Sequence, residues 1–180
     1  MAYKRILTIQ DISCVGQCSM TVAMPILSAC GHETCILPTA ILSTHTGGFG
    51  KPQVVHLGDN LLEFARHWQE NDIRFDAILT GYIGSEKALD AVFSIVDSLL
   101  AENGILIVDP AMADHGRLYS GLTQEYASKM LQLCARADIM IPNLTEACML
   151  TGCEYKNEFD EAYIPHVAGK LHEMGIPCVV

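Results

Sequence analysis

Asp76-Ala77-Ile78-Leu79-Thr80 and Gly104-Ile105-Leu106-Ile107-Val108 are two short apolar runs with a long helical pattern between them. Gly81-Tyr82-Ile83-Gly84 follows the first run as a turn, and Ser85 caps a predicted helix that continues to about Glu102. Parallel neighbouring strands need a crossover of this kind, and it is usually a helix. The stretch therefore predicts a βαβ unit in a parallel sheet covered by helices.

The same alternation continues on both sides of this unit. Further strands are predicted at residues 5–9, 34–37, 138–141 and from 177 onward, and further helices at 18–30, 60–70, 123–136, 144–151 and 158–174. Residues 43–52 contain three glycines and a proline, which predicts an irregular loop. The chain shows no repeat, low-complexity tract or linker, so we expect one α/β domain over residues 1–180 with a mainly parallel sheet.

The final residues, Pro177-Cys178-Val179-Val180, are an apolar run without a turn or a polar tail. A parallel strand at this position calls for a further loop and helix. We therefore expect the domain to be incomplete, with its C-terminal part missing from these 180 residues.

The amino-acid composition of the chain indicates which classes of partner it can bind. The chain has 21 acidic and 11 basic residues, a net charge of −10, which makes nucleic acids and anionic membranes poor partners. It has no secretory or membrane-spanning segment, so we expect a cytoplasmic protein. Its eight cysteines include no pair with zinc-knuckle spacing. Their apolar neighbours favour small buried side chains over metal or redox roles.

Polar side chains follow several predicted strands, at the edge where parallel sheets bind their ligands. Asp109, Asp114 and Glu146 are carboxylates of this kind, with no Lys or Arg close in sequence to Asp109 or Glu146. Such a group suits a hydrated Mg²⁺ that bridges nucleotide phosphates. Two structural alternatives stay open: Glu146 can cap its own helix, and Asp109 can hydrogen-bond the adjacent loop.

Two further residues on this edge allow several interpretations. Tyr82 can stack on a flat ring or shield the core at its rim. His45 can be a general base, a ligand donor or an ordinary loop histidine. The chain has no Gly-Lys-Ser/Thr phosphate loop, so any use of ATP follows a different architecture.

Four segments carry a resemblance to a known family. They are Ser43-Thr44-His45-Thr46-Gly47, Thr80-Gly81-Tyr82-Ile83-Gly84-Ser85, Val108-Asp109-Pro110-Ala111-Met112-Ala113-Asp114 and Ile141-Pro142-Asn143-Leu144-Thr145-Glu146-Ala147. With the opening strand at Arg5, they resemble the pyridoxal kinases of the ribokinase-like superfamily along nearly the whole chain. The last two segments are shared by wider relatives, whereas the first two point to vitamin B6.

The resemblance implies a three-layer αβα fold and ATP-dependent phosphorylation of the 5′-hydroxymethyl group of a vitamin B6 vitamer. It places the vitamer against Asp11, His45, Thr46, Gly47 and Tyr82. It places Mg-ATP against Asp109, Asp114, Tyr119, Asn143 and Glu146, with Mg²⁺ at Asp109 and Glu146. It also implies a homodimer.

The chain departs from the family pattern at two points. Asp11 stands where the family usually has serine, which leaves the preferred vitamer open. The family's Gly-x-Gly-Asp segment, whose aspartate is the catalytic base, is absent from these 180 residues. We therefore expect no turnover by this chain alone. The alternatives are a hydroxymethylpyrimidine or sugar kinase of the same superfamily, or a non-catalytic B6-binding protein.

Overall fold

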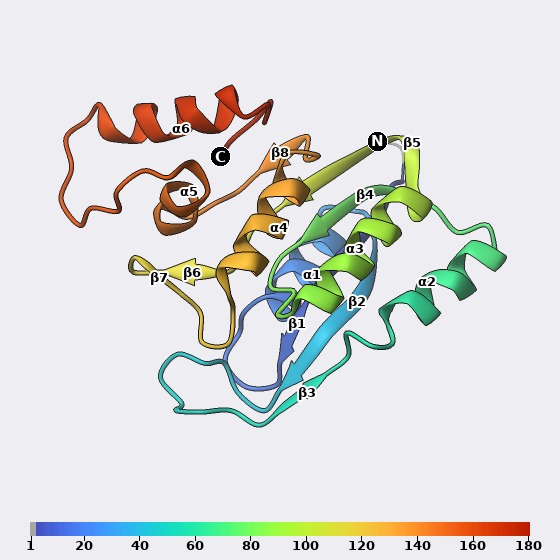
Figure 1. Cartoon of the computed structure of the whole chain (residues 1–180). Helices are drawn as coiled ribbons and strands as arrows, with labels where there is room; N and C mark the ends of the chain where they lie inside the picture. The colour runs from blue at the N-terminus through green and yellow to red at the C-terminus, as the bar shows by residue number, and fades with distance from the viewer. Residues whose placement is uncertain (1–2) are drawn as a thin grey trace. The chain divides into compact units, whose positions relative to one another are not determined.

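A computed structural model describes residues 3–180, which divide into two compact units (Figure 1). The first unit extends to Leu106 and the second runs from Ile107 to Val180. The boundary falls inside strand β5 (Leu100–Val108), which contributes residues to both units. The predicted vitamer-binding residues all belong to the first unit, and the predicted Mg-ATP residues all belong to the second.

The sheet of the first unit has the order β3-β2-β1-β4, followed by β5. Its strands are β1 (Arg5–Ser13), β2 (Glu33–Leu42), β3 (Val54–His56) and β4 (Phe75–Thr80). β1 pairs in parallel with both β2 and β4, and the short β3 runs antiparallel to β2. The predicted α/β fold with a mainly parallel sheet is confirmed.

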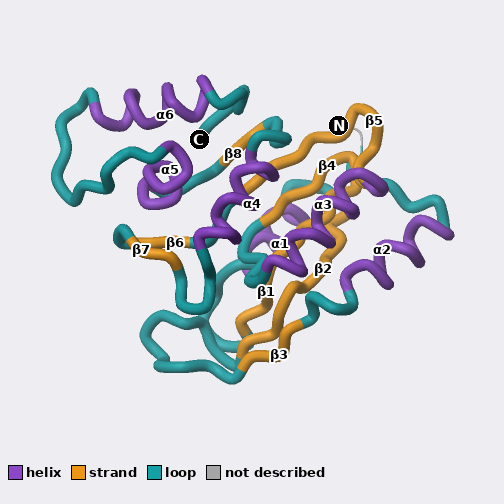
Figure 2. The backbone as a smooth tube through the Cα atoms, viewed as in Figure 1, coloured by secondary structure: helices purple, strands orange, loops and turns teal. Residues whose placement is uncertain are grey.

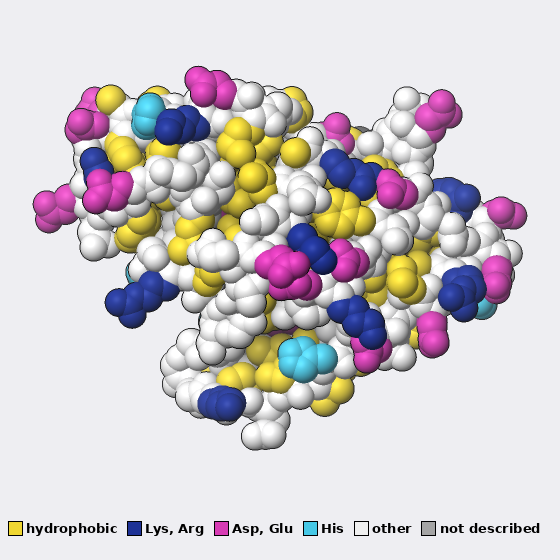
Figure 3. Space-filling view, viewed as in Figure 1, with side chains coloured by type: hydrophobic (Ala, Val, Ile, Leu, Met, Phe, Trp, Pro, Cys, Tyr) yellow, Lys and Arg dark blue, Asp and Glu magenta, His cyan; other side chains and the backbone are white. Residues whose placement is uncertain are grey.

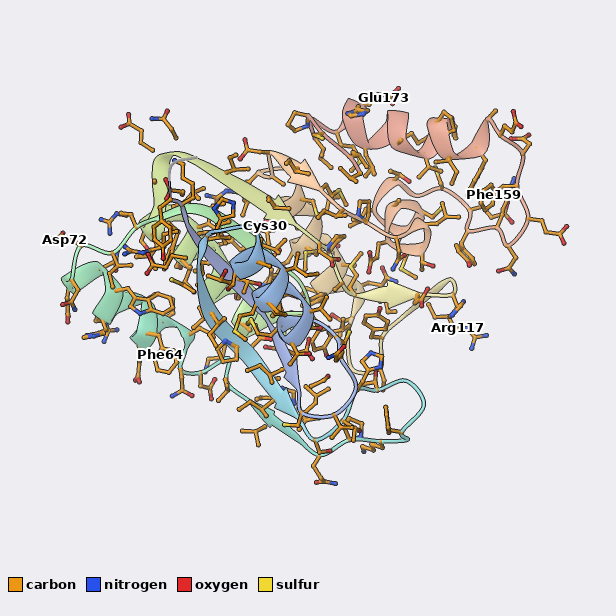
Figure 4. The ribbon with its side chains drawn as sticks, turned by 180° about the vertical axis from the view of Figure 1, so that it is seen from behind. Cys30, Phe64, Asp72, Arg117, Phe159 and Glu173 are labelled. Atoms are coloured by element: carbon orange, nitrogen blue, oxygen red, sulfur yellow. The ribbon has the colours of Figure 1, made fainter. Side chains whose placement is uncertain are left out.

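Helices cover both faces of this sheet. Helix α1 (Met20–Ala29) lies on one face, in front of β1 and β2 in Figure 4. Helices α2 (Leu61–Glu70) and α3 (Glu86–Leu99) pack together on the other face, where α3 lies in front of the sheet in Figure 1. α3 buries Leu89, Val92 and Ile95, residues at helical spacing, and so builds the core of this layer.

Helices make up most of the regular secondary structure of the second unit (Figure 2). It contains the hairpin β6 (Ala113–Asp114) and β7 (Arg117–Leu118), strand β8 (Ile139–Met140), and helices α4 (Gln124–Cys134), α5 (Leu144–Thr151) and α6 (Tyr163–Glu173). The last residues of β5 pair in parallel with β8. Val179 adds a parallel bridge to Met140, so the apolar C-terminal run lies beside β8 as a strand would.

Several element boundaries differ from the sequence prediction. β1 was expected to end at Ile9 but continues to Ser13, because Ile12 and Ser13 remain paired with the end of β2. The helix expected to reach Glu102 ends at Leu99, and β5 begins directly after it. α6 begins at Tyr163 rather than Glu158, because a turn precedes it in which Asp160 accepts a hydrogen bond from the amide of Ala162.

The expectation that the cysteines are buried was largely wrong. Of the eight, all within residues 3–180, only Cys134 and Cys148 are buried, and all eight are free thiols. Cys30 shows why: it follows α1 (Figure 4), whose apolar side chains Val22, Met24 and Ile26 are themselves exposed. Apolar neighbours in the sequence therefore did not indicate a buried position.

No helix within residues 3–180 is long and apolar enough to cross a membrane. On the face shown in Figure 3, Asp and Glu side chains are spread among Lys and Arg instead of forming one large patch.

Candidate active site

The end of β1 carries a run of buried polar side chains. Thr8, Gln10, Asp11 and Ser13 are all buried, and Asp11 is only 5% exposed. The pairing of β1 with β2 is irregular between Gln10 and Ile12, a bulge of the kind that often re-aims side chains beside functional sites. Ser13 Oγ lies 3.5 Å from Asp11 Oδ2. At the upper limit for a hydrogen bond, this contact does little to compensate a buried carboxylate.

Tyr82 follows β4 and is held beside this strand end. Its backbone carbonyl accepts a 2.8 Å hydrogen bond from Thr39 Oγ1, and its side chain is half-buried. Gly84 has φ +84°, and a Cβ there would lie 2.8 Å from the Tyr82 ring, so the ring packs where no side chain could stand. Burial, and then the charge of Asp11, raise the pKa of the Tyr82 hydroxyl. The structure therefore places Tyr82 near Asp11, and their role in vitamer binding stays a prediction.

The predicted loop after β2 is bonded to the loop after β1. The His45 amide donates to the carbonyl of Val15 at 2.8 Å, and the Gly47 amide donates to His45 Nδ1 at 3.2 Å. Because Nδ1 accepts, Nε2 carries the proton in the neutral ring. Thr46 and Gly47 are exposed on this loop. All of the predicted vitamer-binding residues thus lie on β1, on the turn after β4, or on this loop.

Three further residues of this region were not predicted as functional. Gln10 Nε2 donates to Thr8 Oγ1 at 2.6 Å, and a Cβ on Gly81 would lie 2.7 Å from Gln10 Oε1, so glycine is required for that close approach. Thr80 Oγ1 is fully buried without a hydrogen-bond partner in the described part of the chain. Polar residues inside an otherwise apolar strand were the available signal.

In the second unit, Glu146 is a buried acceptor for three backbone amides. Its Oε1 accepts from Met112 at 3.0 Å and from Ala113 at 3.4 Å, and its Oε2 accepts from Asn143 at 2.9 Å. The side chain is 1% exposed. With the Asn143 side chain it forms a capping box at the start of α5. Glu146 therefore fixes the loop after β5 onto the start of α5.

Two carboxyl groups of this unit have raised pKa values. Burial raises the pKa of Glu146 to about 7, although its three amide donors act in the opposite direction. Burial raises the pKa of Asp109 to about 6, opposed by the Ala111 amide, which donates to Asp109 Oδ1 at 3.1 Å. The charge of Asp109 also raises the pKa of Glu146. Perturbed pKa values of this kind cluster at functional sites.

The other predicted Mg-ATP residues surround these two less closely. The Asp114 carboxylate is exposed and accepts from the His115 amide at 2.8 Å; no interaction joins it to Asp109 or Glu146 among residues 3–180. The Tyr119 amide donates to the carbonyl of Met112 at 2.8 Å. Asn143 Nδ2 donates to the carbonyl of Ala113 at 2.8 Å. Tyr119 and Asn143 thus hold the same loop that Glu146 holds.

The donor set fits Mg²⁺ in part. Within the described residues, no three His, Cys, Asp or Glu side chains form a ready-made metal cluster. Mg²⁺ commonly takes only one or two carboxylates together with substrate phosphates. Asp109 is suited to this, since among residues 3–180 only one of its oxygens is engaged, by the Ala111 amide. Both Glu146 oxygens already accept amide hydrogens, so its place at the metal stays a prediction.

The second unit also has an apolar groove of about 280 Å³. Residues of α5, α6 and the C-terminal run line it, and Asn143 is the one predicted site residue among them. The groove therefore does not coincide with the carboxylates.

Comparison with solved structures defines the class: the chain has the α/β fold of the pyridoxal kinases. A pyridoxal kinase from Leishmania donovani in complex with ADP and pyridoxamine gives a TM-score of 0.83 at 25% identity, covering 98% of this chain and 61% of that chain. A Bacteroides thetaiotaomicron protein, assigned as a phosphomethylpyrimidine kinase and crystallised with pyridoxal, gives a TM-score of 0.90 at 32% identity. The match covers 97% of this chain and 61% of that chain.

The chain belongs to the phosphomethylpyrimidine kinase family, whose sequence model matches residues 26–180. The pyridoxal kinase of Arabidopsis thaliana is 33% identical over 174 residues, which are 92% of this chain and 55% of that protein. The chain thus spans little more than half the length of this relative.

Proposed function

We propose that this chain is part of an enzyme that transfers the γ-phosphoryl group of ATP to the 5′-hydroxymethyl group of pyridoxal, pyridoxine or pyridoxamine. The observation that carries the proposal is the meeting of Tyr82 with the buried Asp11 carboxylate at the end of β1. An aromatic face beside a hydrogen-bond acceptor suits a flat ring with polar substituents. The pyridoxal kinases among the relatives support the same substrate class.

In this proposal the first unit binds the vitamer. Tyr82 packs on the pyridine ring, and Thr46 and Gly47 border it on the loop after β2. His45 closes over the substrate, with Nε2 as its available donor because Nδ1 accepts from the Gly47 amide. A sugar kinase would need hydroxyl-binding polar groups where Tyr82 stands, so the aromatic ring favours a flat-ring substrate. A B6 vitamer and hydroxymethylpyrimidine both meet this requirement, and the pyridoxal kinases among the relatives favour the vitamer.

The second unit binds the Mg-ATP side. Asp109 and Glu146 would hold Mg²⁺, which when bound neutralises the charge of the phosphates during transfer. Asp109 does so with a half-buried carboxylate, where charges are screened less than at the surface. Asp114 and Tyr119 border the nucleotide from the loop that Glu146 holds, and Asn143 borders it from the start of α5. We propose that both units belong to one kinase domain, acting in the cytoplasm as a homodimer.

The proposal predicts a defined set of products. The test uses the 180-residue chain and the same chain joined to whatever coding sequence follows it in its natural gene. Each receives Mg-ATP with pyridoxal, pyridoxine, pyridoxamine, hydroxymethylpyrimidine or ribose, and products are identified by mass spectrometry. We expect a B6 phosphate from the longer form and none from the shorter, which has no Gly-x-Gly-Asp segment. Phosphorylated pyrimidine or ribose without any B6 phosphate would contradict the substrate assignment.

Asp109→Asn is expected to weaken Mg-ATP binding by the longer form about tenfold, whereas Asp114→Asn weakens it about threefold. Asp109 is half-buried and Asp114 is exposed, so removing the Asp109 charge removes the less screened interaction. Calorimetric titration measures both values, with the exposed Asp160→Asn as control. An Asp109→Asn protein that binds as tightly as the control would remove Asp109 from the metal side.

A further inference from the structure

The Asp11 carboxylate is buried without a positive partner. It is 5% exposed, and within residues 3–180 no Lys, Arg or His side chain forms an ion pair with it. Its one hydrogen bond in the described part of the chain is the 3.5 Å contact from Ser13 Oγ. Carboxylates buried in proteins are normally paired with cations or accept several hydrogen bonds, because leaving water otherwise costs free energy. Asp11 has neither form of compensation.

A second buried polar group lies on the neighbouring strand. Thr80 is in register with Ile9, which stands two residues before Asp11, and Tyr82 stands two residues after Thr80. Thr80 is fully buried, and its hydroxyl has no hydrogen-bond partner among the described residues. The Thr80 hydroxyl is closed to solvent, whereas Asp11 keeps a small exposed fraction beside the half-buried Tyr82 ring, so Asp11 is the group to which a ligand can supply the missing partner.

The missing partner of a carboxylate is a cation that can donate a hydrogen bond. No backbone amide of the described residues fills this role at Asp11, in contrast to Glu146, which accepts from three of them. Vitamin B6 vitamers offer two such groups: a protonated ring nitrogen, which all three can carry, and the 4′-ammonium group, which only pyridoxamine carries. Both are N–H donors with a positive charge, the chemistry that pairs best with a buried carboxylate.

Resting on the proposed function, we propose that Asp11 is a specificity residue that accepts a hydrogen bond from a positively charged nitrogen of the vitamer. Tyr82 then packs on the ring while Asp11 neutralises its charge. A neutral ring of the same shape would leave the carboxylate buried and unpaired, and is therefore rejected.

The test measures vitamer binding to the 180-residue chain by calorimetry, so it does not depend on turnover. Asp11→Asn keeps the shape of the side chain and removes its charge, and Asp11→Ser introduces the residue usual in pyridoxal kinases. Asp72→Asn, at an exposed aspartate of the same unit after α2 (Figure 4), is the matched control. A benzene analogue of pyridoxine, with carbon in place of the ring nitrogen, tests the role of that nitrogen.

We expect Asp11→Asn to raise the dissociation constant of at least one vitamer about tenfold, with Asp72→Asn within twofold of the natural protein. A loss of affinity confined to pyridoxamine would identify the 4′-ammonium group as the partner of Asp11. A loss of affinity shared by all three vitamers would identify the ring nitrogen as the partner of Asp11. In that case the benzene analogue should bind weakly to the natural protein, and the substitution should not change its affinity. Changes below twofold for all three vitamers overturn the role of Asp11 and leave the kinase proposal standing. If the natural chain and its longer form bind no vitamer at all, both proposals fall.

Thermal unfolding gives an independent readout. Without ligand, Asp11→Asn is expected to raise the melting temperature, because it removes an uncompensated buried charge. With saturating vitamer, the melting temperature of the natural protein is expected to rise more than that of the variant, because tighter binding stabilises the folded state more. A variant that melts lower without ligand would show that Asp11 serves the fold itself and would overturn the proposal.

Discussion

Replacing Glu146 with alanine is expected to lower the free energy of unfolding by about 4 kcal/mol. The substitution leaves the buried amides of Met112, Ala113 and Asn143 without their acceptor, and each unsatisfied buried group costs about 1–3 kcal/mol. Part of this loss is offset, because burial already raises the pKa of Glu146 to about 7 and its charge is costly to keep. Urea denaturation monitored by circular dichroism measures the difference.

Two further variants make this prediction specific. Glu146→Gln keeps one acceptor oxygen but turns an amide group toward a donor, so we expect about half the loss. Glu173→Ala, at an exposed glutamate of α6 labelled in Figure 4, is expected to change stability by less than about 0.5 kcal/mol. A Glu146→Ala protein within about 1 kcal/mol of the natural one would show that the three amides find other acceptors.

Replacing Gly16 with alanine is expected to cost about 3 kcal/mol and to weaken vitamer binding. Gly16 has φ +85°, a conformation that costs an L-residue about 1–2 kcal/mol. In addition, its new Cβ would lie 2.9 Å from His45 Cβ and 3.2 Å from the Phe49 ring, and such overpacking adds about 1–3 kcal/mol. The loop that carries His45 must shift to relieve this contact. Urea denaturation and calorimetric vitamer titration measure the two effects.

The chain provides a matched control for the backbone cost. Gly48 also has φ +85°, but a Cβ there would meet no atom within 4 Å. Gly48→Ala is therefore expected to cost only about 1 kcal/mol. The difference in unfolding free energy between the two variants measures the cost of the contact between position 16 and His45. Equal losses in both variants would mean that the His45 loop moves freely away from Gly16.

Much of this fold could be predicted from the sequence because local signals agree with the packing. Ser85 caps α3 with a side chain that accepts from the Ala88 amide at 3.2 Å. Asn143 and Glu146 form the capping box that opens α5, and Gly152, at φ 71°, ends it. Each signal is a short-range interaction between residues a few positions apart, so the sequence displays it directly.

The sequence could not reveal features that depend on distant partners. Asp11 and Ser13 look like loop residues, yet they belong to β1 because β2 continues to pair with it. The three acceptor contacts of Glu146 include two with residues more than thirty positions away. The exposure of Cys30 depends on which face of α1 meets the sheet. The proximity of Tyr82 to Asp11 likewise follows from the tertiary fold and not from either motif alone.

The position of β1 between two parallel neighbours has a consequence for the energetics of ligand binding. β1 is hydrogen-bonded to β2 on one side and to β4 on the other, so its backbone is ordered before any ligand arrives. The pairing with β4 ends at Ile9, but Gln10 and Ile12 on either side of Asp11 both pair with β2, so Asp11 meets its ligand as a largely preorganised acceptor. The conformational entropy lost on binding then falls mainly on the glycine-rich loop of residues 43–52. Affinity should accordingly respond more to stiffening that loop than to any change in the sheet beneath it.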